Sequence, residues 1–513
     1  MNLAETCEFW ARWQPEAVAM SQSGRHRTWS ELEERTRRIA VGLRGKGVTA
    51  GDRVGILGAN ALSWCELAIG ILRAGAVVVP LNVRATTSEL AYMVDAVSLS
   101  AIAHDATLVD RYEPLAAERP NTLRIALDDR APSDITLSAL AAQGHDLDPT
   151  IVAGIAGSDP AVVAFTSGTT GYPKGAVLTH DNVFATANNY TRTEGWDSGT
   201  AMLCCVPLAF TGGVINNFLI TFVVGGTLLL EEFDPVTALN LIVSWPVNAM
   251  TGVPIMYEGI ASAPGFDSAD LSSLGTAITG GALVPAPLLR RYEAKGVYIR
   301  QAYSLTEATA STTVLPRSHF LSKRDAAGLP APHTRVRIVD GGRREVPVGE
   351  VGEIAVSGPQ VCAGYWGDPE ASSAAVADGW LYTGDMGTVD ADGFLRVVDR
   401  KKDMIISGGL NVYPAEIERV VGEFPGVGEV AAVGTDHERW GETVAVVIGG
   451  PGVADVDLAK LHEHCRTHLA DYKLPRYIVR STEALPRSMS GKVLRRVLRD
   501  GLDTSVAHRT PAR

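Results

Sequence analysis

The stretch Thr166-Ser-Gly-Thr-Thr-Gly-Tyr-Pro-Lys174-Gly175 combines three glycines, four Ser or Thr hydroxyls and one lysine directly after an apolar run. Glycines let the backbone approach a ligand closely, and successive backbone N–H groups form an anion-binding concavity. Residues 161–165 (AVVAF) predict a buried strand before this loop, and Ala176-Val-Leu178 predicts a strand after it. The stretch therefore predicts a phosphate site between two strands.

Two other interpretations of this loop are less satisfactory. A Walker A motif needs Gly-Lys-Ser/Thr at the start of a helix, whereas Gly175 follows Lys174 here. A Ser/Gly-rich surface linker has no use for a strand on each side or for a Tyr-Pro-Lys-Gly ending. We therefore prefer the phosphate site.

Around the loop, the hydrophobic pattern predicts an α/β fold. From about Thr28 to Ile278, strand-like runs such as 53–57 and 76–80 alternate with amphipathic stretches such as 30–43 and 61–72. Ser30-Glu-Leu-Glu33 predicts a capping box at a helix start. Short strands separated by Gly/Asp turns then predict a β-rich subdomain at about 329–399.

The C-terminal part has a third pattern. Residues 403–502 predict a small α+β domain with helices at 414–421 and 458–469 and strands at 430–433 and 443–447. A chain of 513 residues exceeds what one hydrophobic core usually supports. We therefore expect a large N-terminal α/β domain with several subdomains, residues 1–399, and this smaller domain. The tail 503–513 has no periodicity and is expected to be frayed.

Composition excludes several classes of protein. Apolar residues make up 46% and charged residues 20%, which argues against disorder, and the net charge of −12 argues against nucleic-acid binding. The six cysteines form no CxxC pair and indicate reduced thiols of a cytosolic protein. The first residues lack the features of a signal peptide, and the most apolar window, 218–230, is too short to span a bilayer.

Three further segments carry chemistry. Gln301-Ala-Tyr-Ser-Leu-Thr-Glu307 offers an aromatic face for a base, a hydroxyl for a phosphate and a carboxylate for Mg²⁺. Trp380-Leu-Tyr-Thr-Gly-Asp385 ends in an acid which, with Arg400, could grip a ribose. Leu485-Pro-Arg-Ser-Met-Ser-Gly-Lys-Val-Leu-Arg-Arg496 places Lys492 on a Gly-hinged loop before a basic helix.

Together with Asp399-Arg-Lys-Lys-Asp-Met-Ile-Ile-Ser-Gly-Gly409, these segments resemble the adenylate-forming superfamily of acyl-CoA synthetases, peptide-synthetase adenylation domains and luciferases. The resemblance covers most of the chain, with the motifs in the family's order and spacing. It implies that a carboxylate attacks the α-phosphate of ATP and expels pyrophosphate, and that a thiol then attacks the acyl-adenylate and expels AMP. It also implies a mobile C-terminal domain that alternates between the two half-reactions about a hinge at 400–402, with Lys402 as the hinge residue.

The resemblance assigns the ATP contacts residue by residue. Glu307 would hold Mg²⁺, Thr306 would contact the α-phosphate, and Lys492 would bridge the carboxylate and α-phosphate oxygens. These three are the expected catalytic residues. The phosphate loop would bind through Thr166, Ser167, Gly168, Thr169, Thr170, Gly171 and Lys174. The adenine and ribose would contact Gly280, Gly281, Ala282, Gln301, Ala302, Tyr303, Ser304, Asp385, Val397 and Arg400.

Coenzyme A is the expected thiol substrate. By the resemblance, Ser407, Gly408 and Gly409 would line the pantetheine tunnel, and Lys473 and Arg476 are candidate contacts of the CoA nucleotide. The segment 408–418 is similar to the acyl-CoA synthetase version of this site. Peptide-synthetase domains usually carry an aspartate in the segment that is 207–213 here. Its absence disfavours an amino acid, because a buried ammonium would lack a partner.

Two departures from the family pattern bear on the acid. Phe210 stands where many CoA synthetases have His, and Ala302 and Ser304 stand where Gly is frequent. The Ala302 methyl narrows the acyl pocket, so we expect a short or medium-chain fatty acid or a single-ring acid. The other pocket candidates are mostly apolar and include no arginine for a second carboxylate. The full set is Phe210, Val214, Asn217, Phe218, Val253, Met256, Thr279, Gly280 and Ala302.

The resulting expectation is a cytoplasmic, AMP-forming acyl-CoA ligase that uses ATP, Mg²⁺ and CoA, with no nucleic-acid partner and no membrane span. The resemblance is also compatible with a homodimer. One alternative is a ligase that loads a separate carrier protein. Another, from a different class, is a non-catalytic nucleotide-binding regulator, against which Lys492, Glu307 and the complete phosphate loop argue.

Overall fold

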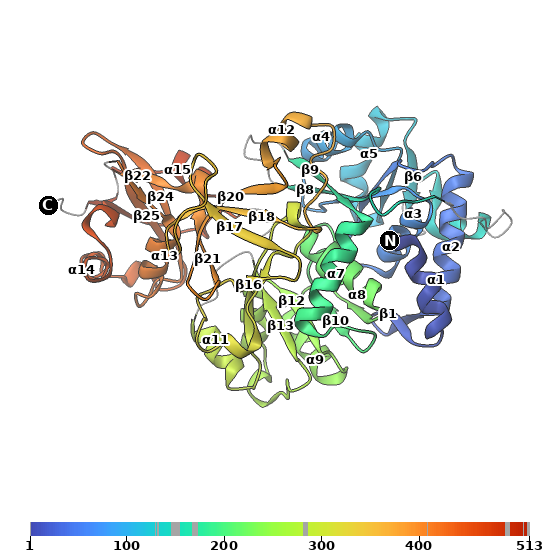
Figure 1. The fold of residues 1–513 in the computed structure, drawn as a ribbon, viewed down its shortest axis with the longest axis horizontal. Helices are drawn as coiled ribbons and strands as arrows, with labels where there is room; N and C mark the ends of the chain where they lie inside the picture. The colour runs from blue at the N-terminus through green and yellow to red at the C-terminus, as the bar shows by residue number, and fades with distance from the viewer. Residues whose placement is uncertain are drawn as a thin grey trace. The chain divides into compact units, whose positions relative to one another are not determined.

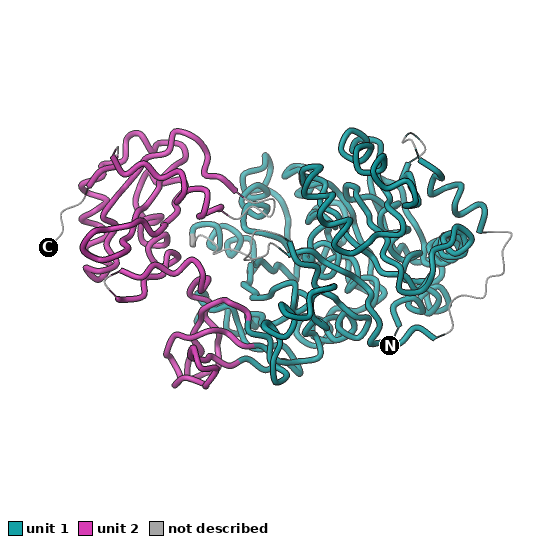
Figure 2. The backbone as a smooth tube through the Cα atoms, turned by 90° about the horizontal axis from the view of Figure 1, so that it is seen from above, with its two compact units in different colours: residues 1–336, 356–382 teal, residues 337–355, 383–513 magenta. Residues whose placement is uncertain are grey.

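The structure is a computed structural model that describes residues 2–128, 130, 133–144, 154–166, 173–280, 286–407, 409–487, 493–505 and 507–509. The chain forms two compact units, one of residues 1–336 and 356–382 and one of residues 337–355 and 383–513 (Figure 2). Both combine helices with sheets, which confirms the expected fold class. The domain boundary at Arg400 and the hinge at 400–402 stay predictions.

The phosphate loop joins two strands of a seven-stranded sheet (Figure 1). Its order is β7 (Ile135–Thr136), β6 (Leu123–Ala126), β5 (Ala101–His104), β3 (Arg53–Leu57), β4 (Val77–Leu81), β8 (Pro160–Thr166) and β9 (Lys174–Thr179). All neighbouring strands are parallel except β8 and β9, which are antiparallel. Helices α2 (Trp29–Gly45), α3 (Leu62–Arg73), α4 (Thr87–Val97), α5 (Val109–Glu118) and α6 (Leu137–Gln143) connect the earlier strands.

A nine-stranded sheet carries the other segments of the first unit that are expected to bind ATP and the acid. Its order is β16 (Leu329–Pro330), β15 (Thr313–Val314), β14 (Ile299–Tyr303), β13 (Thr276–Thr279), β12 (Ala249–Gly252), β10 (Ala201–Cys204), β11 (Thr227–Leu230), β1 (Val18–Gln22) and β2 (Arg25–Thr28). The strands from β14 to β1 are parallel neighbours, so their carboxyl ends meet at one edge. Its helices include α1 (Leu3–Trp13), α7 (His180–Glu194), a π-helix η2 (Gly212–Leu219), α8 (Ile220–Val224), α9 (Pro235–Ser244), α10 (Pro254–Ser262) and α11 (Ala286–Glu293).

The hydrophobic core joins the two large sheets. In β4, Val78 belongs to a cluster that contains side chains of both sheets together with Trp29, Trp64 and Phe218 from the helices. Val77 and Val79 point to the opposite face, where they pack with α4 and α5. The strand is therefore buried on both faces, as parallel strands covered by helices are.

The start of α2 differs from the sequence expectation. The capping box is Thr28 with Glu31: the Glu31 N–H donates to the Thr28 hydroxyl and the Thr28 N–H donates to the Glu31 carboxylate. The prediction of Ser30 with Glu33 was wrong by two residues. Ser30 already lies within the first helical turn, and Thr28 is the last residue of β2.

The later part of the chain contains two smaller sheets. A five-stranded sheet has the order β17 (Arg335–Val339), β18 (Gly352–Ser357), β20 (Trp380–Val389) and β19 (Val376–Ala377), with β21 (Leu395–Arg400) paired to β20 and α12 (Pro369–Ala375) before β19. A six-stranded sheet has the order β23 (Leu410–Val412), β22 (Ile405–Ser407), β25 (Gly441–Gly449), β26 (Tyr477–Arg480) and β27 (His508–Arg509), with β24 (Glu429–His437) paired to β25. Helices α13 (Pro414–Gly422), α14 (Leu458–His468) and α15 (Arg495–Asp500) complete this part.

The tail is more ordered than its composition predicts. Strand β27 pairs with β26, His508 opposite Ile478 and Arg509 opposite Tyr477, so the expectation that all of 503–513 is frayed was wrong. A two-residue strand has no periodicity from which it could be predicted. In the described ranges, no helix is long and apolar enough to cross a membrane.

Candidate active site

The phosphate loop is the connection between β8 and β9. Thr166 and Lys174 lie opposite each other at the ends of these strands, and the Thr166 hydroxyl donates to the Lys174 carbonyl at 3.4 Å. Ser167, Gly168, Thr169, Thr170 and Gly171 lie outside the described residues. Antiparallel pairing up to Thr166 and Lys174 therefore fixes both ends of the loop.

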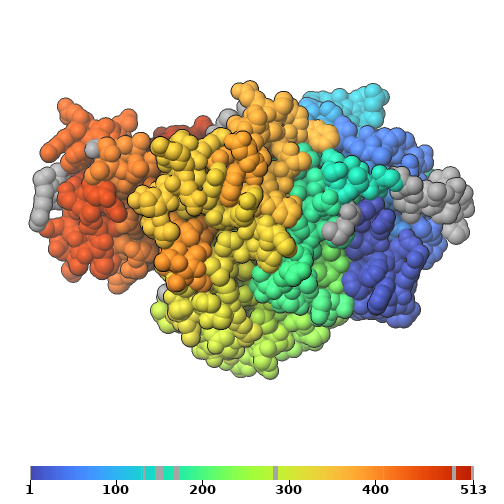
Figure 3. Space-filling view, viewed as in Figure 1, coloured from blue at the N-terminus to red at the C-terminus, as the bar shows by residue number. Residues whose placement is uncertain are grey.

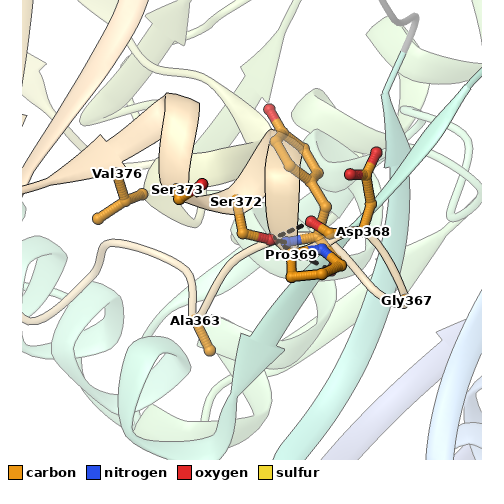
Figure 4. A pocket seen from close by; sticks show the side chains of 8 residues that line it. Ala363, Gly367, Asp368, Pro369, Ser372, Ser373 and Val376 are labelled. Atoms are coloured by element: carbon orange, nitrogen blue, oxygen red, sulfur yellow. Dashed lines mark hydrogen bonds between the residues drawn. The ribbon is translucent and has the colours of Figure 1, made fainter.

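The Lys174 ammonium lies beside the segment that leads into α12. Its Nζ is 3.8 Å from the Asp368 carboxylate and 5.5 Å from the centre of the Tyr365 ring. Asp368 also lines an open pocket of about 510 Å³, together with Ala363, Gly367 and Ser372 (Figure 4). The ion pair between Lys174 and Asp368 is partly exposed, so a substrate phosphate can compete with Asp368 for Lys174.

Glu307 lies one short turn after β14, in the helical turn η4 (Thr306–Ala308). Its carboxylate accepts a hydrogen bond from the Tyr365 hydroxyl, with 2.7 Å between Oε1 and the hydroxyl oxygen. The Thr306 and Thr211 hydroxyl oxygens are 2.8 Å apart. One carboxylate next to hydroxyl groups fits Mg²⁺, because that ion is usually held by one or two carboxylates and by substrate phosphates.

A buried polar face of α7 holds the Glu307 segment. Thr186 donates to the Thr309 carbonyl at 3.1 Å, and Asn189 donates to the Ser311 hydroxyl at 3.1 Å. Nearer the start of the helix, Asn182 donates to the carbonyls of residues 359 and 361, at 2.7 and 2.9 Å. Figure 3 shows the segment after β18, in orange, beside the green residues of this helix. The sequence does not indicate this role, because polar residues on a helix usually predict a solvated face.

Two adjacent residues after Glu307 have left-handed backbone conformations. Thr309 has φ 47° and Ala310 has φ 58°, and both are buried. A β-branched residue with positive φ is a genuine outlier and persists only where the surroundings determine it. The Thr309 hydroxyl donates to the Gln360 carbonyl at 2.7 Å, which, with the α7 contacts, supplies such surroundings.

The residues expected at the adenine come together at the ends of β13 and β14. Tyr303 is the last residue of β14, Ser304 follows it half-buried, and the Gln301 amide donates to the Arg324 carbonyl at 2.6 Å. A Cβ on Gly280 would lie 3.1 Å from the Ala302 carbonyl oxygen, so this position favours glycine. Gly281 and Ala282 lie outside the described residues.

In the second unit, the two residues expected at the ribose form an ion pair. Asp385 in β20 lies directly opposite Arg400 in β21, and the Arg400 Nε is 2.5 Å from the Asp385 carboxylate. The Asp385 side chain is only 6% exposed, whereas that of Arg400 is 42% exposed and can reach a ligand. Val397 is an exposed residue of β21. Paired carboxylate and guanidinium groups at one surface suit recognition of neighbouring hydroxyls.

The acyl-pocket candidates fall into two groups. Val214, Asn217, Phe218, Met256 and Thr279 are buried, and Phe218 packs edge-on against Trp64 in the core. Phe210, Val253, Gly280 and Ala302 are half-buried. Asn217 donates to the Gly212 carbonyl at 2.7 Å and to the Thr251 hydroxyl at 3.0 Å, so it braces the π-helix η2.

The expected CoA and hinge residues are all in the second unit. Ser407 is buried in β22, and Gly409 has φ 81°. Lys473 pairs with Glu416 at 2.7 Å, and Arg476 is buried, pairs with Asp471 at 3.2 Å and lies over the Trp440 ring. Lys402 is exposed in the short turn η6 (Lys401–Asp403). Gly408 and Lys492 lie outside the described residues.

One arginine joins several segments of the second unit. Arg495, at the start of α15, contacts the carboxylates of Asp399 at 3.3 Å, Asp403 at 3.2 Å and Glu418 at 2.8 Å. Ion pairs thus connect Asp399 and Asp403, on either side of the expected hinge, to helix α15, which follows the segment that contains Lys492. The motif around Lys492 contained Arg495, but nothing in the sequence assigned it a partner.

Within the described residues, no group of three or more His, Cys, Asp or Glu side chains could hold a metal ion by itself. A metal at Glu307 would therefore share its coordination with substrate phosphates, which is typical of Mg²⁺ sites.

Two family models match the chain. The model of the AMP-binding enzyme covers residues 7–366, and the model of the AMP-binding enzyme C-terminal domain covers residues 416–492. The first match alone includes more than half of the 513 residues.

Individual relatives match over almost the whole length. A feruloyl-CoA synthase of Amycolatopsis sp is 40% identical over 486 residues, 94% of this chain and 96% of that protein. A long-chain-fatty-acid–CoA ligase of Mycobacterium tuberculosis is 34% identical over 487 residues, 93% of this chain and 94% of that protein. The solved structure of o-succinylbenzoate CoA synthetase from Bacillus subtilis with its acyl-adenylate intermediate has a TM-score of 0.86 at 26% identity, covering 98% of this chain and 99% of that one.

Proposed function

Because the chain belongs to the family of AMP-binding enzymes and is an ATP-dependent acyl-CoA synthetase, we propose that its acid is a single-ring aryl acid related to the acyl group of feruloyl-CoA. The enzyme activates a carboxylic acid with ATP and transfers the acyl group to CoA. The observation that carries the proposal is the 40% identity to a feruloyl-CoA synthase over 94% of the chain.

Each charged group of the site would have a separate role in the first half-reaction. Lys174 and the loop after Thr166 would bind the terminal phosphates, and Glu307 would hold Mg²⁺, which neutralises the phosphate charge when bound. Thr306 would donate to the α-phosphate, and Lys492 would reduce the repulsion between carboxylate and phosphate. The protein contributes position and charge, because the substrate carboxylate itself is the nucleophile.

The second half-reaction needs a path for the thiol. Ser407, Gly408 and Gly409 would line it, and Lys402 would be the hinge about which the C-terminal domain moves. Lys473 and Arg476 would contribute to the nucleotide end of CoA. Because both already have acidic partners, binding there would have to displace or extend these ion pairs.

The burial of the acyl-pocket candidates supports a short, flat acid. Val214 and Phe218, both in η2, are each 1% exposed and pack into the core, so a long chain could not pass them without repacking. The half-buried residues Phe210, Val253 and Ala302 would provide apolar contacts to the acid. An aromatic ring suits a narrow slot between such side chains, since rings gain from stacked or edge-on contacts.

A medium-chain fatty acid is the second candidate. It is favoured by the apolar character of Val253 and Met256 and by the 34% identity to a long-chain-fatty-acid–CoA ligase. We also propose a cytoplasmic location, because all six cysteines are buried free thiols, which is usual in a reducing compartment.

The test is acid-dependent pyrophosphate release, followed by detection of the acyl-CoA product. The panel should contain hydroxycinnamic, cinnamic and benzoic acids and fatty acids of eight, twelve and sixteen carbons. We expect kcat/KM to be at least about tenfold higher for the best aryl acid than for any fatty acid. A preference for the sixteen-carbon acid would contradict the proposed substrate class and leave the acyl-CoA synthetase activity in place.

A further inference from the structure

The side chain of Tyr365 lies between two charged groups that act on ATP in the proposed function. Its hydroxyl donates to the Glu307 carboxylate at 2.7 Å, and the Lys174 ammonium is 5.5 Å from its ring centre. The first group is the expected metal ligand and the second belongs to the phosphate loop. The motifs of the sequence analysis assigned no role to this tyrosine.

The backbone fixes Tyr365 to both of these segments. The Trp366 N–H donates to the Gly175 carbonyl at 2.8 Å, and the Val177 N–H donates to the Gly364 carbonyl at 2.9 Å, so the tyrosine segment pairs with β9. On the other side, the Cys362 N–H donates to the Glu307 carbonyl at 2.8 Å. The short segment 362–366 therefore bonds both to β9, which begins at Lys174, and to the backbone of Glu307. It fixes the distance between these two residues.

The hydrogen bond from Tyr365 leaves the Glu307 carboxylate able to bind a cation. A carboxylate that accepts the Tyr365 O–H at Oε1 keeps further lone pairs on both of its oxygens. The flat ring meanwhile presents its electron-rich face to the ammonium.

We propose that Tyr365 is a positioning residue for the ATP half-reaction, with its hydroxyl aiming Glu307 at Mg²⁺ and its ring holding Lys174 at the terminal phosphates. The proposal rests on the roles given to Glu307 and Lys174 in the proposed function. It extends them to a residue that would act only through Glu307 and Lys174. A ligand fixed by a hydrogen bond from a neighbouring residue loses less freedom when the metal binds.

A purely structural role for Tyr365 makes a different prediction. Loss of its hydroxyl would then change stability, and ATP binding would change to the same extent with and without Mg²⁺. A positioning role predicts that the change depends on the metal, because the hydroxyl acts on ATP only through Glu307.

The test compares the full-length protein with its Tyr365→Phe variant, which keeps the ring and removes only the hydroxyl. Calorimetric titration with ATP and excess Mg²⁺ should give a Kd about tenfold higher for the variant, the effect of one hydrogen bond to a charged group. Titration with ATP and EDTA should give the same Kd for both proteins. An unchanged Kd with Mg²⁺, or an equal increase in both titrations, would overturn the proposal.

Two further variants isolate the contribution of the ring. Tyr365→Leu removes the ring as well, and it should raise the Kd for ATP in EDTA twofold to fivefold above that of the wild type. This is roughly the effect of one exposed cation–π contact. Tyr92→Phe, on α4, is the matched control and should leave both Kd values unchanged. Wild-type protein that binds Mg²⁺ and ATP but releases no pyrophosphate with any acid would contradict the proposed function and leave the inference about Tyr365 standing.

Discussion

The attachment of the N-terminal helix α1 should weaken in mild acid, because one of its hydrogen bonds depends on a neutral histidine. The Nδ1 of His180 accepts a hydrogen bond from the Leu3 N–H at 3.1 Å, and the His180 side chain is 2% exposed. Burial lowers the pKa of His180 from 6.5 to about 4, although the neighbouring Asp159 partly opposes the shift. A protonated His180 could not accept the hydrogen bond from Leu3.

The sign and size of the effect follow from linkage. The open state binds more protons than the closed state between pH 4 and 6.5, so the attachment is at full strength above pH 6.5 and weakens as the pH falls towards 4. At pH 5 the loss is about 2 kcal/mol, or roughly 30-fold in the opening equilibrium. The full loss, below pH 4, is about 3 kcal/mol. His180 is also the first residue of α7, where a positive charge is further disfavoured by the helix dipole.

Hydrogen–deuterium exchange of peptides from α1 measures this opening directly. Between pH 7.5 and pH 5, after correction for the intrinsic exchange rate, we expect protection of residues 3–13 to fall roughly 30-fold in the wild type. His180→Gln keeps an acceptor oxygen and removes the titration, so its protection should change by less than about threefold. If both proteins lose α1 protection equally, His180 does not control the attachment.

Two other predictions concern the site, and a third concerns the stability of the fold. Lys492→Ala should lower adenylation by at least about 100-fold but largely preserve thioester formation from supplied acyl-adenylate, and equal loss of both would refute the assigned role of Lys492. Asp385→Asn should raise the KM for ATP by about tenfold, the loss of a charged hydrogen bond, and an unchanged KM would count against Asp385 as a ribose contact. The Arg300–Glu194 pair is nearly fully buried, so Arg300→Met alone should lower the free energy of unfolding by about 3–5 kcal/mol. Combining Arg300→Met with Glu194→Gln should cost less than the sum of the two single changes in denaturant unfolding, and strict additivity would contradict this coupling.

Most elements with strong periodicity could be predicted from the sequence. The apolar run before the phosphate loop became β8, and the helix expected at 414–421 became α13 with Pro414 in its first turn. Side-chain spacing determines such elements locally, so no knowledge of the tertiary fold is needed. The ends of the elements were less predictable. The strand expected at 176–178 begins at Lys174 in β9, so the lysine of the phosphate loop is part of a strand.

Parts of the site that depend on tertiary contacts could not be predicted in this way. Thr186 and Asn189 lie on a helix whose sequence indicates a solvated face, and only the fold brings the segment after Glu307 against them. The left-handed conformation of Thr309 has no local signal, because threonine rarely adopts it. Asp385 and Arg400 are a different case, since the sequence already grouped them as ribose contacts and strands β20 and β21 place them opposite each other; their contact with a ribose stays a prediction.

In the reaction of an acyl-CoA synthetase, a carboxylate attacks the α-phosphate of ATP, and AMP leaves when CoA attacks the acyl carbon. An acid labelled with ¹⁸O in both carboxylate oxygens tests this directly, with mass spectrometry of the AMP, pyrophosphate and acyl-CoA. We expect one ¹⁸O atom in AMP, one in the thioester carbonyl and none in pyrophosphate, because the bridging oxygen stays with phosphorus when the thioester forms. Label in pyrophosphate or inorganic phosphate, or unlabelled AMP, would contradict it.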